Sequence, residues 1–180
     1  MAALVEFASQ LETEQLLLRS VQSCDAAFLH EILASPQVRK YLGGPVAKAQ
    51  HEARFQSYLR GARGIGIWVV VLKAENAPCG LIVLNPHREH DAYEISYEFH
   101  PSHWGKGYAT QAVNKVVEHA FTDIKLTCIV AETQSANKAS IRLLISLNFQ
   151  EMKRLERFGE EQVIYINQQK TGAEITLAPV

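Results

Sequence analysis

The sequence predicts an α/β protein, an α+β arrangement in which a mixed sheet carries helices on both faces. Three observations lead to this prediction. Strand patterns between residues 65 and 100 are joined by short turns, which indicates an antiparallel meander. The pattern then becomes strand, helix, strand, helix and strand, which is typical of crossover connections. The 180 residues suit one domain with a sizeable core, so we expect a single domain over 1–180 with its core at about 11–170.

The first part of the chain predicts a polar arm, one strand and two helices. "LLLRSV" at 16–21 is a short apolar strand pattern. "CDAAFLHEILAS" at 24–35 has apolar residues at helical spacing and should end before Pro36. "YLGGP" at 41–45 is expected to interrupt regular secondary structure. The sequence at 46–64 predicts a helix that ends at Gly61 or Gly64.

The remaining elements follow in order. Val, Ile and Trp in "IGIWVVVLKAE" predict a strand at 65–75, "APCG" predicts a turn, and strands are predicted at 80–87 and 91–100. Later patterns predict helices at 108–123 and 135–148 and strands at 125–133, 151–158 and 161–169. The strands at 91–100 and 125–133 should be parallel neighbours, joined by a right-handed crossover. The tail 170–180 should be peripheral.

Composition excludes several classes of function. The formal net charge of −1 disfavours a bulk nucleic-acid binder. No apolar run approaches the ~18 residues needed to span a membrane. The three cysteines lie far apart and no His, Cys, Asp or Glu cluster has metal-ligand spacing, so we expect reduced thiols, a cytoplasmic protein and no metal.

A glycine-rich turn joins the strand at 91–100 to the helix at 108–123. It contains Gly105 and Gly107 with Lys106 between them, and Ala109 follows. A helix N-terminus offers unpaired N–H groups to an anion, and glycines allow a close approach, so the turn predicts a phosphate site. Neither the P-loop pattern nor the dinucleotide fingerprint is present. The turn could instead be tight only because the strand and the helix pack closely.

The wider context resembles the GNAT family of acyl-CoA-dependent N-acetyltransferases. That family's loop reads Q/R-x-x-G-x-G/A, and residues 104–109, "WGKGYA", match it except that Trp104 replaces Gln or Arg. Trp at this position, the opening "LETEQLLLRSV" and the segment "NKASIRLLISLNF" resemble the branch typified by the ribosomal-protein-alanine N-acetyltransferases. Asn148 stands where this branch usually has Gly, and Asn tolerates the left-handed conformation wanted after a helix. The resemblance covers roughly residues 11–170.

The resemblance implies a GNAT-type fold, with a mostly antiparallel sheet splayed at an acetyl-CoA cleft between the strands 91–100 and 125–133. The pyrophosphate would lie on the loop amides, and the pantetheine arm would pair with the backbone of the first strand, where a bulge would free an amide for the thioester carbonyl. The implied cofactor-binding residues are Tyr97, Phe99, Trp104, Gly105, Lys106, Gly107, Tyr108, Ala109, Thr110 and Asn137. Asn137 could equally be an ordinary helix cap.

The candidate catalytic residues are Glu94 and Ser140. Glu94 could take a proton from the amine, with Glu98 on the same strand face as the second candidate. Many GNAT enzymes protonate the departing thiolate with a tyrosine, but Leu144 occupies that position here. The resemblance then suggests Ser140 as the donor, although Ser140 could also bond only locally in its helix.

The predicted function is acetyl transfer from acetyl-CoA to a primary amine. A protein N-terminus is the leading acceptor, and a small molecule such as a polyamine, an amino acid or an aminoglycoside is the alternative. A non-catalytic acyl-CoA-binding module and a domain for another nucleotide remain open, as does the choice between monomer and homodimer. We expect no nucleic-acid partner and no membrane association.

Overall fold

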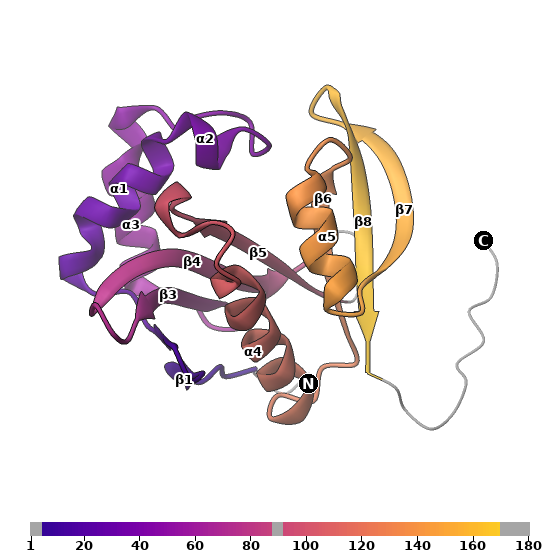
Figure 1. Ribbon diagram of the computed structural model, residues 1–180, viewed down its shortest axis with the longest axis horizontal. Helices are drawn as coiled ribbons and strands as arrows, with labels where there is room; N and C mark the ends of the chain where they lie inside the picture. The colour runs from indigo at the N-terminus through magenta and orange to yellow at the C-terminus, as the bar shows by residue number, and fades with distance from the viewer. Residues whose placement is uncertain (1–4, 88–91, 170–180) are drawn as a thin grey trace.

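The computed structural model describes residues 5–87 and 92–169, which form one eight-stranded sheet (Figure 1). The strand order is β1-β2-β3-β4-β5-β6-β8-β7. All neighbouring strands are antiparallel except β5 and β6. The strands are β1 (Gln10–Glu12), β2 (Leu16–Arg19), β3 (Gly66–Leu72), β4 (Ala77–Pro86), β5 (Tyr93–Phe99), β6 (Cys128–Gln134), β7 (Gln150–Arg157) and β8 (Glu160–Gln168). The tail 170–180 lies outside the described residues, so its predicted peripheral position stays a prediction.

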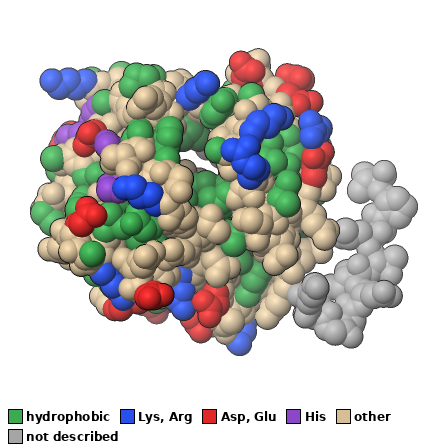
Figure 2. Space-filling model, viewed as in Figure 1, with side chains coloured by type: hydrophobic (Ala, Val, Ile, Leu, Met, Phe, Trp, Pro, Cys, Tyr) green, Lys and Arg blue, Asp and Glu red, His purple; other side chains and the backbone are tan. Residues whose placement is uncertain are grey.

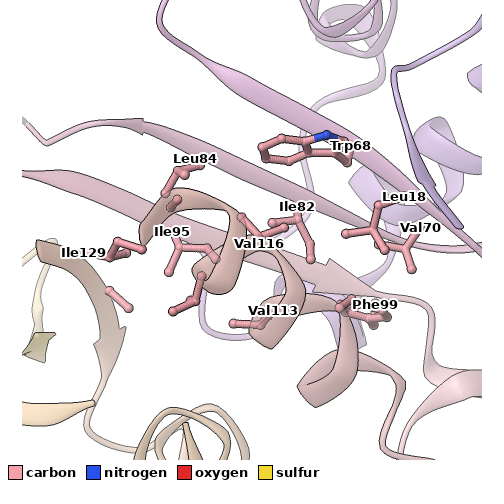
Figure 3. Packing of buried hydrophobic residues seen from close by; sticks show 14 of the residues in the cluster. Leu18, Trp68, Val70, Ile82, Leu84, Ile95, Phe99, Val113, Val116 and Ile129 are labelled. Carbon is pink, nitrogen blue, oxygen red and sulfur yellow. The ribbon is translucent and has the colours of Figure 1, made fainter. Parts of the chain in front are cut away.

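Helices cover both faces of the sheet, which confirms the predicted arrangement. They are α1 (Ala26–Ala34), α2 (Pro36–Arg39), α3 (His51–Arg60), α4 (Tyr108–Thr122) and α5 (Lys138–Ser146), with 3₁₀ turns η1 (Ser23–Asp25), η2 (Lys48–Gln50) and η3 (Pro101–His103). On one face, Val113 and Val116 of α4 pack with Ile95 and Phe99 of β5 (Figure 3), and Leu144 of α5 belongs to the same core. On the other face, residues of α1 and α3 pack against β3 and β4. The sheet is therefore the middle of three layers.

Several local predictions were wrong, each for an identifiable reason. "APCG" is the beginning of β4, and the turn lies at 73–76, where Asn76 takes a positive φ of 50°. The three-residue β1 and the four-residue α2 were missed because they are too short to show a period. Pro36 does end the preceding helix, as predicted, but it also occupies the first turn of α2, where its missing N–H is harmless.

The predicted helix at 46–64 is shorter than expected. It comprises the 3₁₀ turn η2 and then α3, which ends at Arg60. The C-cap is Gly61 with φ +60°, which agrees with the expected stop at a glycine. Asn148, after α5, has φ +64°, so the left-handed conformation predicted there is confirmed.

β5 and β6 are parallel neighbours, as the crossover predicted, but they pair over only two positions. These positions are Tyr93 opposite Ile129 and Glu94 opposite Val130. Beyond Glu94, β5 stays paired with β4 and β6 stays paired with β8, so the two strands diverge. The surface is hollowed between these two parts of the molecule (Figure 2). The cleft that the sequence implied is therefore present between the two strands.

Gly80 fixes how β4 meets the end of β5. It lies opposite Phe99, and a Cβ built on Gly80 would stand 2.6 Å from the Phe99 ring. That separation is shorter than van der Waals contact, so the ring can lie across β4 only because position 80 has no side chain. Phe99 is 5% exposed, which leaves the ring little room to move away.

We expect Gly80→Ala to lower the free energy of unfolding by about 1–3 kcal/mol, because the added methyl group overpacks the core. Urea denaturation would measure the loss. Gly80→Ala combined with Phe99→Leu should recover part of it relative to the sum of the two single changes, since leucine lacks the clashing ring. Strictly additive losses would contradict this contact.

Candidate active site

The side chains of β5 alternate between the two faces of the sheet at the point where the strand leaves β6. Ile95 and Phe99 are buried in the core beneath α4, and Tyr97 packs against the same core. The pleat therefore turns Glu94, Ser96 and Glu98 to the opposite face, the face on which α1 and α3 pack against β3 and β4. The cleft consequently has two chemically different sides, one with hydroxyl groups and one with carboxylates.

The backbone of β5 presents its free edge to the cleft. The N–H of His100 donates to the carbonyl of Cys79 at 2.9 Å, which places the even-numbered amides of β5 against β4. By alternation, the N–H and C=O groups of Tyr97 and Phe99 point toward the side from which β6 has departed. These groups lie where a pantetheine arm was expected to pair.

The bulge implied in this strand is not there. β4 and β5 pair without a shift from Tyr93 opposite Pro86 to Phe99 opposite Gly80. The register shift lies one strand away, between β3 and β4, at Val70 and Val71. An amide faces the cleft because β6 diverges, and not because β5 is bulged.

The glycine turn has the geometry of an open anion site. Gly105 and Gly107 have φ values of +73° and +80°, and a Cβ at either position would have no neighbouring atom within 4 Å. Close packing of strand and helix therefore does not explain these glycines, whereas the left-handed conformation does. Gly107 caps α4 without a side-chain hydrogen bond, so the amides of Tyr108, Ala109 and Thr110 begin the helix uncapped by a side chain. These amides, together with the exposed Lys106, fit a phosphate group.

The indole N–H of Trp104 is hydrogen-bonded to the backbone of this chain. Its indole Nε1–H donates to the Phe99 carbonyl at 2.7 Å, while half of the side chain is exposed. Indole has a single donor, so Trp104 has none left for a phosphate in this arrangement. Where the family pattern has Gln or Arg, this residue instead connects the phosphate loop to the end of β5.

Tyr97 and Ser140 are brought together across the cleft. The Tyr97 hydroxyl and Ser140 Oγ lie 2.8 Å apart, so one donates a hydrogen bond to the other. Burial raises the pKa of Tyr97 to about 12, which keeps the phenol protonated at neutral pH. Asn137 caps α5 by accepting from the Ser140 N–H at 3.2 Å, and Leu144 is fully buried in the core. The sequence could place Ser140 on this helix, but no pattern linked it to Tyr97.

The two carboxylates of the opposite side differ in surroundings. Glu94 is partly buried and lies at the last position where β5 and β6 pair. Glu98 Oε1 accepts from Arg39 Nη1 at 3.0 Å, and both side chains are largely buried. Burial raises the pKa of Glu98, while Arg39 opposes this shift. Arg39 was missed by sequence reasoning because nothing in its local pattern connects it to residue 98.

Two kinds of feature are not found among the described residues. Across 5–87 and 92–169 no group of three or more His, Cys, Asp or Glu side chains is arranged to hold a metal ion. Within the same ranges no helix is long and apolar enough to cross a membrane.

Comparison with known proteins identifies the fold and the chemistry. The family model described as an acetyltransferase (GNAT) domain matches residues 15–150. The uncharacterized N-acetyltransferase p20 of Bacillus licheniformis is 31% identical over 147 residues, which cover 78% of this chain and 82% of that protein. The chain belongs to the GNAT acetyltransferase family. It is an acetyl-CoA-dependent N-acetyltransferase.

Solved structures share the GNAT fold at low sequence identity. Spermidine N-acetyltransferase from Vibrio cholerae, in complex with CoA and spermine, has a TM-score of 0.76 and 22% identity, and the match covers 87% of this chain and 97% of that chain. Ribosomal-protein-S5-alanine acetyltransferase from Vibrio fischeri has a TM-score of 0.74 and 19% identity, with 91% and 98% covered. At these identities the likeness establishes the fold and leaves the acceptor open.

The phosphate loop yields a prediction with a matched control. Gly107→Val should weaken CoA binding by more than about tenfold, or ~1.4 kcal/mol, because a branched side chain at positive φ distorts the loop and obstructs the amides. Calorimetry with CoA would measure the change. Gly159, at the turn between β7 and β8, has nearly the same φ of +79° and equally open surroundings. Gly159→Val should therefore share the backbone strain but leave CoA affinity intact, and equal losses in both variants would contradict the phosphate site.

Proposed function

We propose that this GNAT enzyme transfers the acetyl group of acetyl-CoA to the α-amine of a protein N-terminus. The observation that carries the chemical part is the hydrogen-bonded pair Tyr97–Ser140 on one side of β5, with Glu94 on the other. Acetyl transfer needs a proton removed from the amine and a proton supplied to the thiolate. Groups of both kinds border the same cleft.

In the proposed mechanism, Glu94 accepts a proton from the acceptor's ammonium, directly or through water. The amine nitrogen then forms a bond to the thioester carbonyl carbon, and the C–S bond breaks. The departing thiolate receives a proton from the Tyr97–Ser140 pair, in which Ser140 is the first candidate for the donor and Tyr97 is the second. The new amide nitrogen loses its second proton to water, and the pair regains its proton from the solvent. A backbone N–H at the free edge of β5 that the pantetheine arm leaves unoccupied is suited to bond the thioester oxygen.

The acceptor class rests on sequence features and on one structural likeness. Trp104 and the segments at 11–21 and 137–149 resemble the branch that acetylates protein N-termini. The ribosomal-protein-S5-alanine acetyltransferase shares the fold, which supports the same class, whereas the spermidine enzyme supports a polyamine as the alternative. Asn137 is proposed to bond the pantetheine arm while it caps α5.

The proposal also covers the cellular location, the domain organisation and the oligomeric state of the enzyme. Cys24, Cys79 and Cys128 are free thiols, which supports a cytoplasmic protein. We further propose a single domain over 1–180 that acts as a monomer or a homodimer, without nucleic acid or membrane.

The acceptor is tested by measuring thiol release from acetyl-CoA with peptides that differ in their first residues and with a panel of polyamines, amino acids and aminoglycosides. We expect the highest kcat/KM with a peptide, and mass spectrometry should place the acetyl group on its α-amine. A higher kcat/KM with a small amine would overturn the assignment to a protein N-terminus, and no release with any amine would overturn the proposed function.

Glu94→Gln tests the base. The change keeps the shape of the side chain and removes its ability to accept a proton, so kcat/KM should fall about 100-fold at neutral pH. Activity should recover partly as pH rises, because the acceptor amine then loses its proton to the solvent. Glu156→Gln, an exposed change on β7, serves as the control. A wild-type rate and pH profile for Glu94→Gln would reassign the base.

Tyr97→Phe and Ser140→Ala test the donor. We expect removal of the true donor to lower kcat about 10- to 100-fold with little change in CoA affinity. The loss is moderate because a hydrogen bond to sulfur is weaker than one to an oxyanion. With the pKa of Tyr97 at about 12, the loss from Tyr97→Phe should be constant between about pH 6 and 9. Unchanged kcat in both single variants and in the double variant would show that the thiolate leaves without their help.

A further inference from the structure

All three side-chain nitrogen atoms of Arg39 donate hydrogen bonds within the protein. Its Nε donates to the Gly44 carbonyl at 3.2 Å, and its Nη2 donates to the Leu42 carbonyl at 2.8 Å. Its Nη1 bonds Glu98 at 3.0 Å, and the residue is 9% exposed. The guanidinium thereby joins the segment 40–46, which follows α2, to strand β5. Since Arg has a planar fork of donors, no other side chain can make these contacts together.

The segment 40–46 is held by backbone hydrogen bonds to Arg39 and, at its far end, by contacts of Val46 with α1 and with His51. Gly43 and Gly44 take φ values of +79° and +83°, and the backbone bends back so that the N–H of Gly44 donates to the Arg39 carbonyl. At its far end the N–H of Val46 donates to Leu33 of α1. Leu42 remains 43% exposed. Among these contacts, the Arg39–Glu98 pair is the one that joins the segment to β5.

Glu98 places this contact at the cleft. It follows Tyr97 directly, on the face of β5 that carries Glu94. α2 and the loop after it extend toward α5 above the space between β5 and β6, and the molecular surface is hollowed there (Figures 1 and 2). The segment 40–46 thus borders the carboxylate side of the cleft, where the amine must arrive if Glu94 is its base.

The pair is poorly explained by stability alone. A buried ion pair loses much of its attraction to the cost of desolvation, and an apolar pair of similar volume is often as stable. Glu98 Oε2 is moreover buried and has no hydrogen-bond partner among the described residues. A buried oxygen without a partner lowers the free energy of unfolding, so the stability of the fold alone does not explain this pair. Its use is instead to hold one segment at one place.

We propose that Glu98 is a positioning residue for the acceptor, which acts through Arg39 to hold the segment 40–46 as one wall of the acceptor site. The inference rests on the proposed function, because it assumes that the amine enters from the Glu94 side. It separates the two carboxylates of β5 by role. Glu94 contacts the amine, whereas Glu98 sets the wall that the rest of the acceptor touches.

Glu98→Met and Arg39→Met would be compared with the wild-type enzyme in steady-state kinetics, since methionine can accept no such hydrogen bond from Arg39. We expect KM for the acceptor to rise about tenfold, or ~1.4 kcal/mol, while KM for acetyl-CoA stays the same. The double variant should be no worse than Arg39→Met alone, because Arg39→Met already removes the contact with Glu98 together with the bonds to Gly44 and Leu42. A loss confined to kcat or to acetyl-CoA binding would overturn the proposal.

A matched control and a second measurement keep the test independent of folding and of activity. Arg19→Gln breaks another Arg–carboxylate pair, between Arg19 of β2 and Asp25 of η1, in which the atoms lie 2.7 Å apart; β2 lies three strands from β5. It should leave both KM values unchanged. Amide hydrogen exchange should become faster at 40–46 in Glu98→Met and stay the same at 105–110. Unchanged exchange at 40–46 would overturn the proposal that the Arg39–Glu98 contact holds this segment, whether or not the wild-type protein acetylates an amine. A wild-type protein that acetylates no amine would overturn only the proposed function.

Discussion

The divergence of β5 from β6 after Glu94 is the constraint on which the rest of the structure depends. Buried backbone groups are almost always paired, and an interior strand normally pairs on both edges. Here β5 keeps β4 along its whole length and loses β6 after two positions. The odd-numbered backbone groups beyond that point, including those of Tyr97, are left for another partner. One partner is within the chain, since Trp104 bonds the Phe99 carbonyl.

The layers on either side keep the two strands apart and supply the chemistry. α4 packs on β5 through Val113 and Val116, while α5 belongs with β6, so the phosphate loop and Ser140 lie on opposite sides of the opening. On the other face, the Glu98 carboxylate of β5 pairs with Arg39 at the end of α2. The pleat of a single strand therefore separates the proposed proton donor from the proposed base. A GNAT enzyme needs both within reach of one thioester carbon, and the free strand edge lies between them.

Much of this could be predicted from the sequence because periodicity reports on local structure. The alternation in "YEISYEFH" assigned Glu94 and Glu98 to one face and Ile95, Tyr97 and Phe99 to the other, and the structure agrees. The glycine turn and the N-x-x-S segment were identifiable because backbone conformation limits which residues fit there. Contacts between residues far apart in the sequence produce no local pattern of this kind. The bond between Tyr97 and Ser140 spans 43 positions and that between Arg39 and Glu98 spans 59, and neither side chain of either pair is unusual in its own neighbourhood. The missing bulge was an error of another kind, because the resemblance supplied a feature that this chain replaces with strand divergence.

The most direct test of the account is the amide hydrogen exchange of Tyr97, measured by NMR with CoA and with 3′-phospho-ADP. CoA carries the pantetheine arm, and the second ligand has the adenosine and the phosphates without the arm. We predict that CoA slows exchange at the Tyr97 amide, because the arm supplies the hydrogen-bond partner that β6 does not. The nucleotide should slow exchange only at the amides of 105–110. Equal effects of the two ligands at Tyr97, or no protection by CoA, would contradict the claim that the free edge of β5 is the binding surface for acetyl-CoA.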